Sequence, residues 1–86
     1  MTYKTQAKLL RTKRTQLAIS QMEIAGKLGY TSAQFVSNWE RGISAPPATT
    51  ARQLCKLLKI DRAVMAKARR SDQMRKLNVQ MQAFMK

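Results

Sequence analysis

The chain has 86 residues and a mass of 9.8 kDa, enough for one small domain but not for a two-domain enzyme with a cleft between its halves. Seventeen Lys and Arg against four Asp and Glu give a net charge of +13, so a polyanion is the expected partner, either nucleic acid or an anionic membrane face. The chain has no His and a single cysteine, Cys55. We therefore expect no enzyme activity, no intrachain disulfide, no metal site and no cofactor.

Hydropathy places the chain in solution. No apolar run approaches the roughly 20 residues of a membrane span, and the polar N-terminus lacks the apolar stretch of a signal peptide. A lone cysteine fits a reducing compartment. We expect a cytoplasmic protein without membrane contact, and no small-molecule ligand is evident.

The charge is unevenly distributed along the chain. Residues 20–42 are neutral overall, whereas residues 1–19 carry +5, residues 43–60 carry +3 and residues 61–86 carry +5. A neutral centre between basic flanks suits direct base reading framed by phosphate contacts.

The composition favours helices throughout. Long stretches rich in Ala, Leu, Lys, Arg, Gln and Met contain few Gly or Pro residues, and no segment alternates with a period of two. An all-α fold is predicted. The first helix spans about residues 4–17, and its inward face is Ala7, Leu10, Arg14 and Leu17.

The second helix opens at Ser20. Ser20 and Glu23 have the spacing of a capping box, in which each side chain bonds the other residue's backbone N–H. Gly29 can adopt the left-handed conformation that ends a helix. The apolar face of this helix is Ile24, Ala25 and Leu28.

A short turn leads into the third helix, which starts at Thr31 or Ser32, both competent N-caps, and ends at Gly42. Trp39 follows Val36 by three residues, so we expect it in the core.

A loop stiffened by the Pro46-Pro47 pair leads to the fourth helix, with Pro47 placed in its first turn. Asp61 is expected to cap the fifth. The predicted inward residues of the fourth helix are Ala51, Leu54, Cys55, Leu57 and Leu58, which makes Cys55 a buried, inert thiol. Those of the fifth helix are Val64, Met65 and Ala68.

Helix, glycine turn, helix is the geometry that projects a second helix into the DNA major groove. The stretches 21–29 (QMEIAGKLG) and 36–42 (VSNWERG) resemble the helix-turn-helix of the lambda-repressor-like family, also called Cro/C1 or Xre. The resemblance extends from Leu10 to Ile60 and includes Arg14 and the loop from Gly42 to Pro46.

This resemblance implies a five-helix DNA-binding domain that acts as a homodimer on a palindromic operator in double-stranded DNA. The domain would span residues 1–70, with the motif at about 20–42. By position, Gln21 would bind a phosphate, and Arg41 with the Gly42 loop would grip the backbone. Arg14, Lys27, Thr31 and Ser32 complete the predicted phosphate contacts. The predicted base-reading residues are Ala33, Gln34, Phe35, Ser37 and Asn38.

Two of these residues carry the base-reading hypothesis. Gln34 and Asn38 are four residues apart and share a helix face, and both amides can bond adenine bidentately. The alternative is an ordinary solvated polar face. For Phe35 two roles are possible: it packs in the groove between helices, or it contacts thymine methyl groups.

The chain departs from the family pattern in three ways. It has one extra residue between Gly29 and Glu40, it has Ala18 where Gly is usual, and 26 residues follow Ile60. Glu40 has Arg41 and Arg14 as possible partners, which favours a structural role for its carboxylate.

Residues 71–86 form a predicted amphipathic helix, whose 3-4-3 spacing is typical of a paired helix. We expect this stripe to dock on a partner subunit. The alternative is that it folds back onto its own domain. Its residues are Met74, Leu77, Met81 and Phe84.

The sequence therefore predicts a DNA-binding transcriptional regulator, a repressor of bacterial or phage type. One rival is a structural RNA-binding protein, which the charge would suit although aromatic stacking residues are few. The other is an antitoxin-like interaction module whose C-terminal helix binds a different protein.

Overall fold

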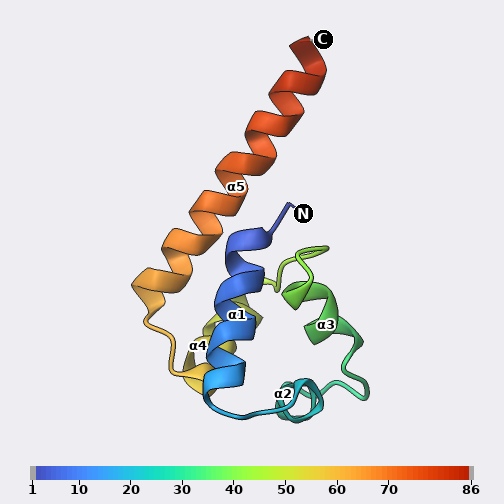
Figure 1. Cartoon of the computed structure of the whole chain (residues 1–86), viewed down its shortest axis with the longest axis vertical. Helices are drawn as coiled ribbons and strands as arrows, with labels where there is room; N and C mark the ends of the chain where they lie inside the picture. The colour runs from blue at the N-terminus through green and yellow to red at the C-terminus, as the bar shows by residue number, and fades with distance from the viewer. Residues whose placement is uncertain (1, 86) are drawn as a thin grey trace.

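The computed structural model describes residues 2–85, which form five α-helices and no strand in that range. The helices are α1 (Lys4–Gln16), α2 (Gln21–Lys27), α3 (Gln34–Glu40), α4 (Ala48–Leu58) and α5 (Arg62–Met85). The predicted all-α class and five-helix arrangement are confirmed. Helix α1 lies between α3 and α5, and α5 reaches well beyond the other helices (Figure 1).

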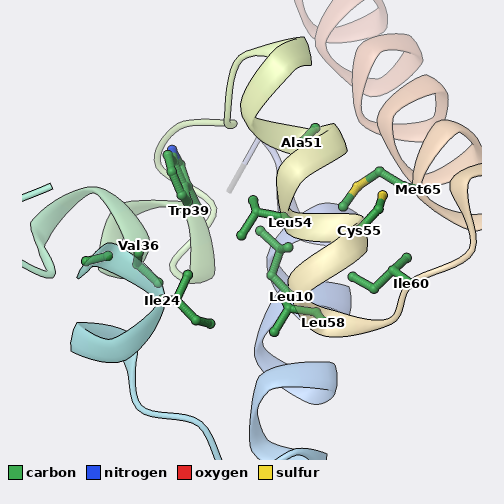
Figure 2. Packing of buried hydrophobic residues seen from close by; sticks show 11 residues of the cluster. Leu10, Ile24, Val36, Trp39, Ala51, Leu54, Cys55, Leu58, Ile60 and Met65 are labelled. Atoms are coloured by element: carbon green, nitrogen blue, oxygen red, sulfur yellow. The ribbon is translucent and has the colours of Figure 1, made fainter. Parts of the chain in front are cut away.

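One hydrophobic core joins the helices. Trp39 is buried as predicted, at 3% exposure, together with Val36 from the same face of α3. Apolar positions spaced three and four apart place one side of each short helix against this core, which is the burial that stabilises helices too short to persist alone. Figure 2 shows the side chains of α2 and α3 facing those of α1 and α4 across the core. The labelled residues are Leu10, Ile24, Val36, Trp39, Ala51, Leu54, Cys55, Leu58, Ile60 and Met65.

Four helices end in the same way, with a residue in the left-handed conformation followed by a backbone N–H that returns to the last turn. After α2, Gly29 has φ +87° and the N–H of Tyr30 donates to the carbonyl of Ala25 at 2.9 Å. The predicted stops at Gly29 and Gly42 are confirmed. Two other left-handed positions are occupied by Ala18 and Lys59, each at φ +55°.

Two boundary details differ from the expectation. Pro47 precedes α4 as its N-cap residue instead of lying in its first turn. Val64, expected to point inward, is 49% exposed because Met65, Ala68 and Asp72 form the face of α5 that is buried. Asp61 does cap α5, accepting the N–H of Ala63 at 2.7 Å.

Helix α5 runs without a break from Arg62 to Met85, so the fifth helix and the C-terminal extension are one element. It packs on α1 and α4 near its start and leaves the body of the domain toward its end (Figure 1). Lys86, the last residue of the predicted extension, lies outside the described residues. No helix within residues 2–85 combines the length and apolarity that crossing a membrane requires.

Candidate nucleic-acid interface

The start of α2 is held by its own side chains. The N–H of Glu23 donates to Ser20 Oγ at 3.0 Å, and the N–H of Ser20 donates to Glu23 Oε1 at 3.3 Å. The predicted capping box is therefore confirmed. Together with the stop at Gly29, it gives a helix of two turns followed by an abrupt change of direction into α3.

Helix α3 begins later than predicted. The residues Thr31 to Ala33 form bends, the N-cap is Ala33, and the first helical residue is Gln34. Ser32 still contributes, because its Oγ accepts the N–H of Gln34 at 3.4 Å. The expected start at Thr31 or Ser32 was wrong because the tight end of α2 and the extra residue between the helices are taken up as turn instead of helix.

The amides predicted to read bases lie side by side on the exposed part of α3. Gln34 Nε2 donates to Asn38 Oδ1 at 2.9 Å, so the two side chains share one face one turn apart. Gln34 is exposed and Asn38 is half-buried, while Val36 and Trp39 lie on the buried side. The hydrogen bond leaves one Nε2–H and the Oε1 of Gln34, and both Nδ2–H groups of Asn38, for an external partner.

Phe35 is 53% exposed, and its ring stacks on Tyr30 with 4.8 Å between the centroids. Tyr30 in turn meets the buried Trp39 edge-on at 6.0 Å. The packing interpretation thus holds for one face of the Phe35 ring, and the rest of the ring stays open to a partner beside the amide pair. Ala33 and Ser37 are half-buried neighbours on the same helix.

A buried carboxylate locks α3 to α1. Glu40 Oε2 accepts from Arg14 Nε at 2.6 Å, and Oε1 accepts from Arg14 Nη2 at 3.0 Å and from Gln21 Nε2 at 3.1 Å. Arg14 Nη1 donates to the carbonyl of Ile19 at 2.9 Å. The Arg14 side chain is 19% exposed and that of Glu40 only 3%. This hydrogen bond to Glu40 raises the pKa of Arg14, so the guanidinium remains charged.

This network gives Arg14 a positioning role. All three guanidinium nitrogens have protein partners, so Arg14 holds α3 to α1, and its contact with a phosphate stays a prediction. Gln21 begins α2 as predicted and keeps one amide hydrogen for an outside acceptor. Of the two alternatives for Glu40, the structure selects Arg14 over Arg41.

The other predicted phosphate contacts surround the amide pair. Lys27 ends α2 and Arg41 directly follows α3, and both side chains are exposed. Thr31 and Ser32 are exposed in the turn between the helices. Gly42, at φ +72°, brings the chain sharply away from α3 after Arg41. The helix-turn-helix therefore offers amides on α3, with the hydroxyls of Thr31 and Ser32 in the turn before it and the cation of Arg41 directly after it.

A second buried carboxylate, Asp72, is 0% exposed and was not predicted from the sequence. It accepts the backbone N–H groups of Thr5 at 3.0 Å and Gln6 at 2.9 Å, in the first turn of α1. Arg75 Nη1 pairs with it at 2.5 Å. Asp72 is the sole acid among residues 62–86, with Arg75 three residues later, and that was the available signal.

The hydrogen bonds decide the charge state of Asp72. Burial alone would raise the pKa of its carboxyl, but the backbone N–H groups of Gln6 and Thr5 and the guanidinium of Arg75 outweigh burial. The pKa of Asp72 is therefore lowered, and the group stays ionised at neutral pH. It supplies the cap that α1 lacks, because Tyr3 at the N-cap position makes no side-chain cap bond.

The predicted stripe on the C-terminal part of α5 is exposed and does not fold back onto the domain. With 100° between successive helical residues, the stripe faces the opposite side of α5 from Met65, Ala68 and Asp72, which dock on the body. From Leu77 to Met85 the chain carries no charged residue. The stripe residues are 58% (Met74), 46% (Leu77), 53% (Met81) and 91% (Phe84) exposed.

Cys55 is buried as predicted, and burial raises the pKa of its thiol. In the described part of the chain, no three His, Cys, Asp or Glu side chains gather as a metal site would require.

Comparison with known proteins identifies the fold. The Helix-turn-helix family model, HTH_3, matches residues 10–64, which is more than half of the chain and covers α2, α3 and α4. The chain belongs to this Cro/C1-type helix-turn-helix family. Comparison with curated proteins and with solved structures gives no match. The family is one of DNA-binding regulators, so the α2–α3 pair described above is its helix-turn-helix.

Proposed function

We propose that this helix-turn-helix protein binds a specific palindromic operator in duplex DNA as a homodimer, with α3 in the major groove, and acts as a repressor. Repression requires no chemistry, because occupying the groove excludes other proteins from the same site. The observation that carries the proposal is the Gln34–Asn38 amide pair, in which exposed Gln34 and half-buried Asn38 share one face of α3 and are joined by a hydrogen bond. Cytoplasmic location remains a prediction.

The amide pair suits base reading by its chemistry. Adenine presents an acceptor and a donor in the major groove, which an amide matches twice. Because residues 20–42 are neutral overall, contacts made there discriminate by hydrogen bonding more than by charge. Phe35 beside the pair offers an apolar edge for a thymine methyl group.

The experiment compares Gln34→Ala with the unchanged chain on an operator selected from a random duplex pool and on unselected duplex. Losing a bidentate base contact should cost about 1–3 kcal/mol on the operator and almost nothing on unselected duplex. Gln53→Ala is the matched control, since Gln53 is an exposed glutamine on α4. Equal losses on both duplexes would mean that Gln34 contacts the backbone, and the base-reading proposal would fail.

The phosphate contacts are tested by salt dependence. Arg41→Ala should weaken all duplexes alike and flatten the plot of log K against log salt by about one unit, because each phosphate contact contributes roughly −0.9 to the slope. Arg14→Ala is the informative contrast, since the structure gives Arg14 an internal partner. If Arg41→Ala leaves the slope unchanged, Arg41 does not meet the backbone.

The homodimer is proposed from the apolar stripe of α5. The stripe points away from its own domain, and in a chain of net charge +13 residues 77–85 are uncharged, so two copies can approach there without local like-charge repulsion. Dimerisation would also supply the second recognition helix that a palindrome requires. Phosphate contacts from the basic flanks would add to affinity.

Sedimentation of Leu77→Gln/Met81→Gln tests this interface. The double variant should be monomeric at concentrations where the unchanged chain is dimeric, because two helices that lose their apolar seam have no replacement contact. Val79→Gln is the control, since Val79 is equally exposed but lies off the stripe. A monomeric unchanged chain would favour the alternative that the stripe binds a different protein.

A further inference from the structure

Beside the apolar packing of Met65 and Ala68, α5 is joined to the start of α1 by a set of directional polar contacts. Asp72 Oδ2 accepts from the backbone N–H of Gln6 at 2.9 Å and from its Nε2 at 3.0 Å, while Oδ1 accepts the N–H of Thr5 at 3.0 Å. Arg75 pairs with Asp72 and also reaches the carbonyl of Thr2 at 3.1 Å and Thr5 Oγ1 at 3.0 Å. An apolar contact between two helices allows one helix to slide along the other, whereas these hydrogen bonds fix both the position and the angle of α5 relative to α1.

Two further residues of α5 extend the junction along the helix. Arg69 Nη1 donates to Gln6 Oε1 at 3.2 Å and to the carbonyl of Pro46 at 2.8 Å. Lys76 Nζ donates to the hydroxyl of Tyr3 at 3.2 Å. The contacts from Arg69 to Lys76 cover about two turns of α5, so they oppose tilting as well as translation.

The same junction is connected to the recognition helix. The N–H of Tyr3 donates at 3.3 Å to the carbonyl of Gly42, the second residue after α3. At the other end of α1, Arg14 and Glu40 hold α3. The direction of α5 is thus set relative to α3 through one rigid helix. The part of α5 that follows Lys76 carries most of the apolar stripe and projects from the body of the domain (Figure 1).

The direction of α5 determines where the apolar stripe lies relative to α3. From Asp72 to Phe84 the helix extends about 18 Å at 1.5 Å per residue, so a tilt of about 10° moves its end by about 3 Å. This is close to the roughly 3.4 Å rise of one base pair. In a dimer joined through the stripe, a tilt of about 10° in each α5 would therefore change the distance between the two copies of α3 by about one to two base pairs.

We propose that Asp72, together with Arg75, sets the half-site spacing that the dimer accepts on DNA. This inference rests on the proposed homodimer. Asp72 and Arg75 are positioning residues in this proposal. They contact no base or phosphate, and they act by fixing the direction of α5, which connects the stripe to α1. Loosening them should leave each recognition helix intact while allowing a range of separations.

The experiment measures binding to a series of duplexes carrying two identical half-sites, with the centre-to-centre distance varied in single base pairs. The unchanged chain should prefer one spacing over its neighbours by about tenfold, and Asp72→Asn should reduce that preference to about threefold or less, because a preorganised arrangement is lost. Lys67→Gln, an exposed change on the same helix, is the control.

A second variant distinguishes a loss of positioning from a loss of folding. Arg75→Gln retains the Asp72 carboxylate that caps α1 but removes the contacts to Thr2 and Thr5, so it should broaden the spacing preference while keeping a cooperative thermal transition. Affinity for a single isolated half-site and the dimer mass in sedimentation are measured alongside, and both should stay unchanged.

The outcomes separate this inference from the function on which it rests. If Arg75→Gln and Asp72→Asn keep the spacing preference of the unchanged chain, or weaken a single half-site as much as a pair, the positioning role is overturned and the homodimer stands. An unchanged chain with no spacing preference at all would overturn the palindrome-binding dimer and this inference together.

Discussion

Each end of α1 is held by a buried carboxylate, but the two carboxylates come from different helices. At the C-terminal end, Glu40 binds Arg14 and connects α1 to α3. At the N-terminal end, Asp72 binds the first turn of α1 and connects it to α5. In both cases one buried carboxylate is bonded by an arginine, but Asp72 also takes backbone N–H groups, which Glu40 does not.

This difference shows how one helix serves two purposes. The Glu40 anchor orients the part of the domain that reads DNA, whereas the Asp72 anchor orients the part proposed to join two copies. Buried carboxylates contribute little to net stability when paired, but they are costly to unpair, which makes them effective at specifying a single geometry. Four experiments test how α1 is held at its two ends.

The largest effect is expected for Glu40→Ala. It leaves the partly buried Arg14 guanidinium without its partner, which should lower the free energy of unfolding by about 3–5 kcal/mol. Guanidinium denaturation provides the measurement. Glu23→Ala is the control, because it removes an exposed carboxylate from the capping box and should cost about 1 kcal/mol. Equal losses for the two variants would mean that the Arg14–Glu40 anchor is no stronger than a surface cap.

Asp72→Asn should have the next largest effect, lowering the free energy of unfolding by about 2–3 kcal/mol because charge-assisted hydrogen bonds to α1 are lost. The matched control is Asp61→Asn at the exposed start of α5, where Asn is an equally good N-cap and stability should hardly change. If Asp72→Asn is as mild as its control, the α5 anchor is looser than the structure indicates.

Acid provides a third test of the same anchor. Because the pKa of Asp72 is lowered in the folded chain, its contribution is fully present above its ordinary value of 3.8 and is lost as the pH falls through the lower folded value. Arg69, Arg75 and Lys76 are the cationic side chains at this junction, and Asp72 is the carboxylate that lies among them. The stability difference between the unchanged chain and Asp72→Asn should therefore narrow below about pH 4 in acid-dependent melting. A difference that is constant from pH 7 to pH 2 would contradict the lowered pKa.

The smallest change concerns how α1 ends. Ala18 holds a left-handed conformation at φ +55°, which costs an L-residue about 1–2 kcal/mol. Ala18→Gly should raise the free energy of unfolding by about 0.5–1 kcal/mol, after the entropy that glycine loses on folding. Gly29→Ala, at φ +87°, is the mirror test and should lower stability by about 1 kcal/mol. Thermal melting of both variants is sufficient, and shifts of the same sign would rule out backbone strain as the cause.

Local signals in the sequence predicted most of the domain. Ser20 with Glu23 specified where α2 begins, and Gly29 and Gly42 specified where α2 and α3 end, because these signals act over four or five residues of neighbouring chain. Periodicity placed Trp39 in the core. The start of α3 was missed because Thr31 and Ser32 are both suitable caps, and only the packing of the turn selects Ala33.

The sequence by itself determined a basic, all-helical, Cro/C1-type domain and the amide face of α3, because helix periodicity, capping and charge depend on residues that are close together in the chain. Only the tertiary structure decided which carboxylate meets which partner. Arg14 is 26 residues from Glu40, and Asp72 is 66 residues from Gln6, so neither contact follows from local spacing. The tertiary structure also showed that the apolar stripe of α5 faces away from its own domain, since that depends on which side of a continuous helix docks on α1.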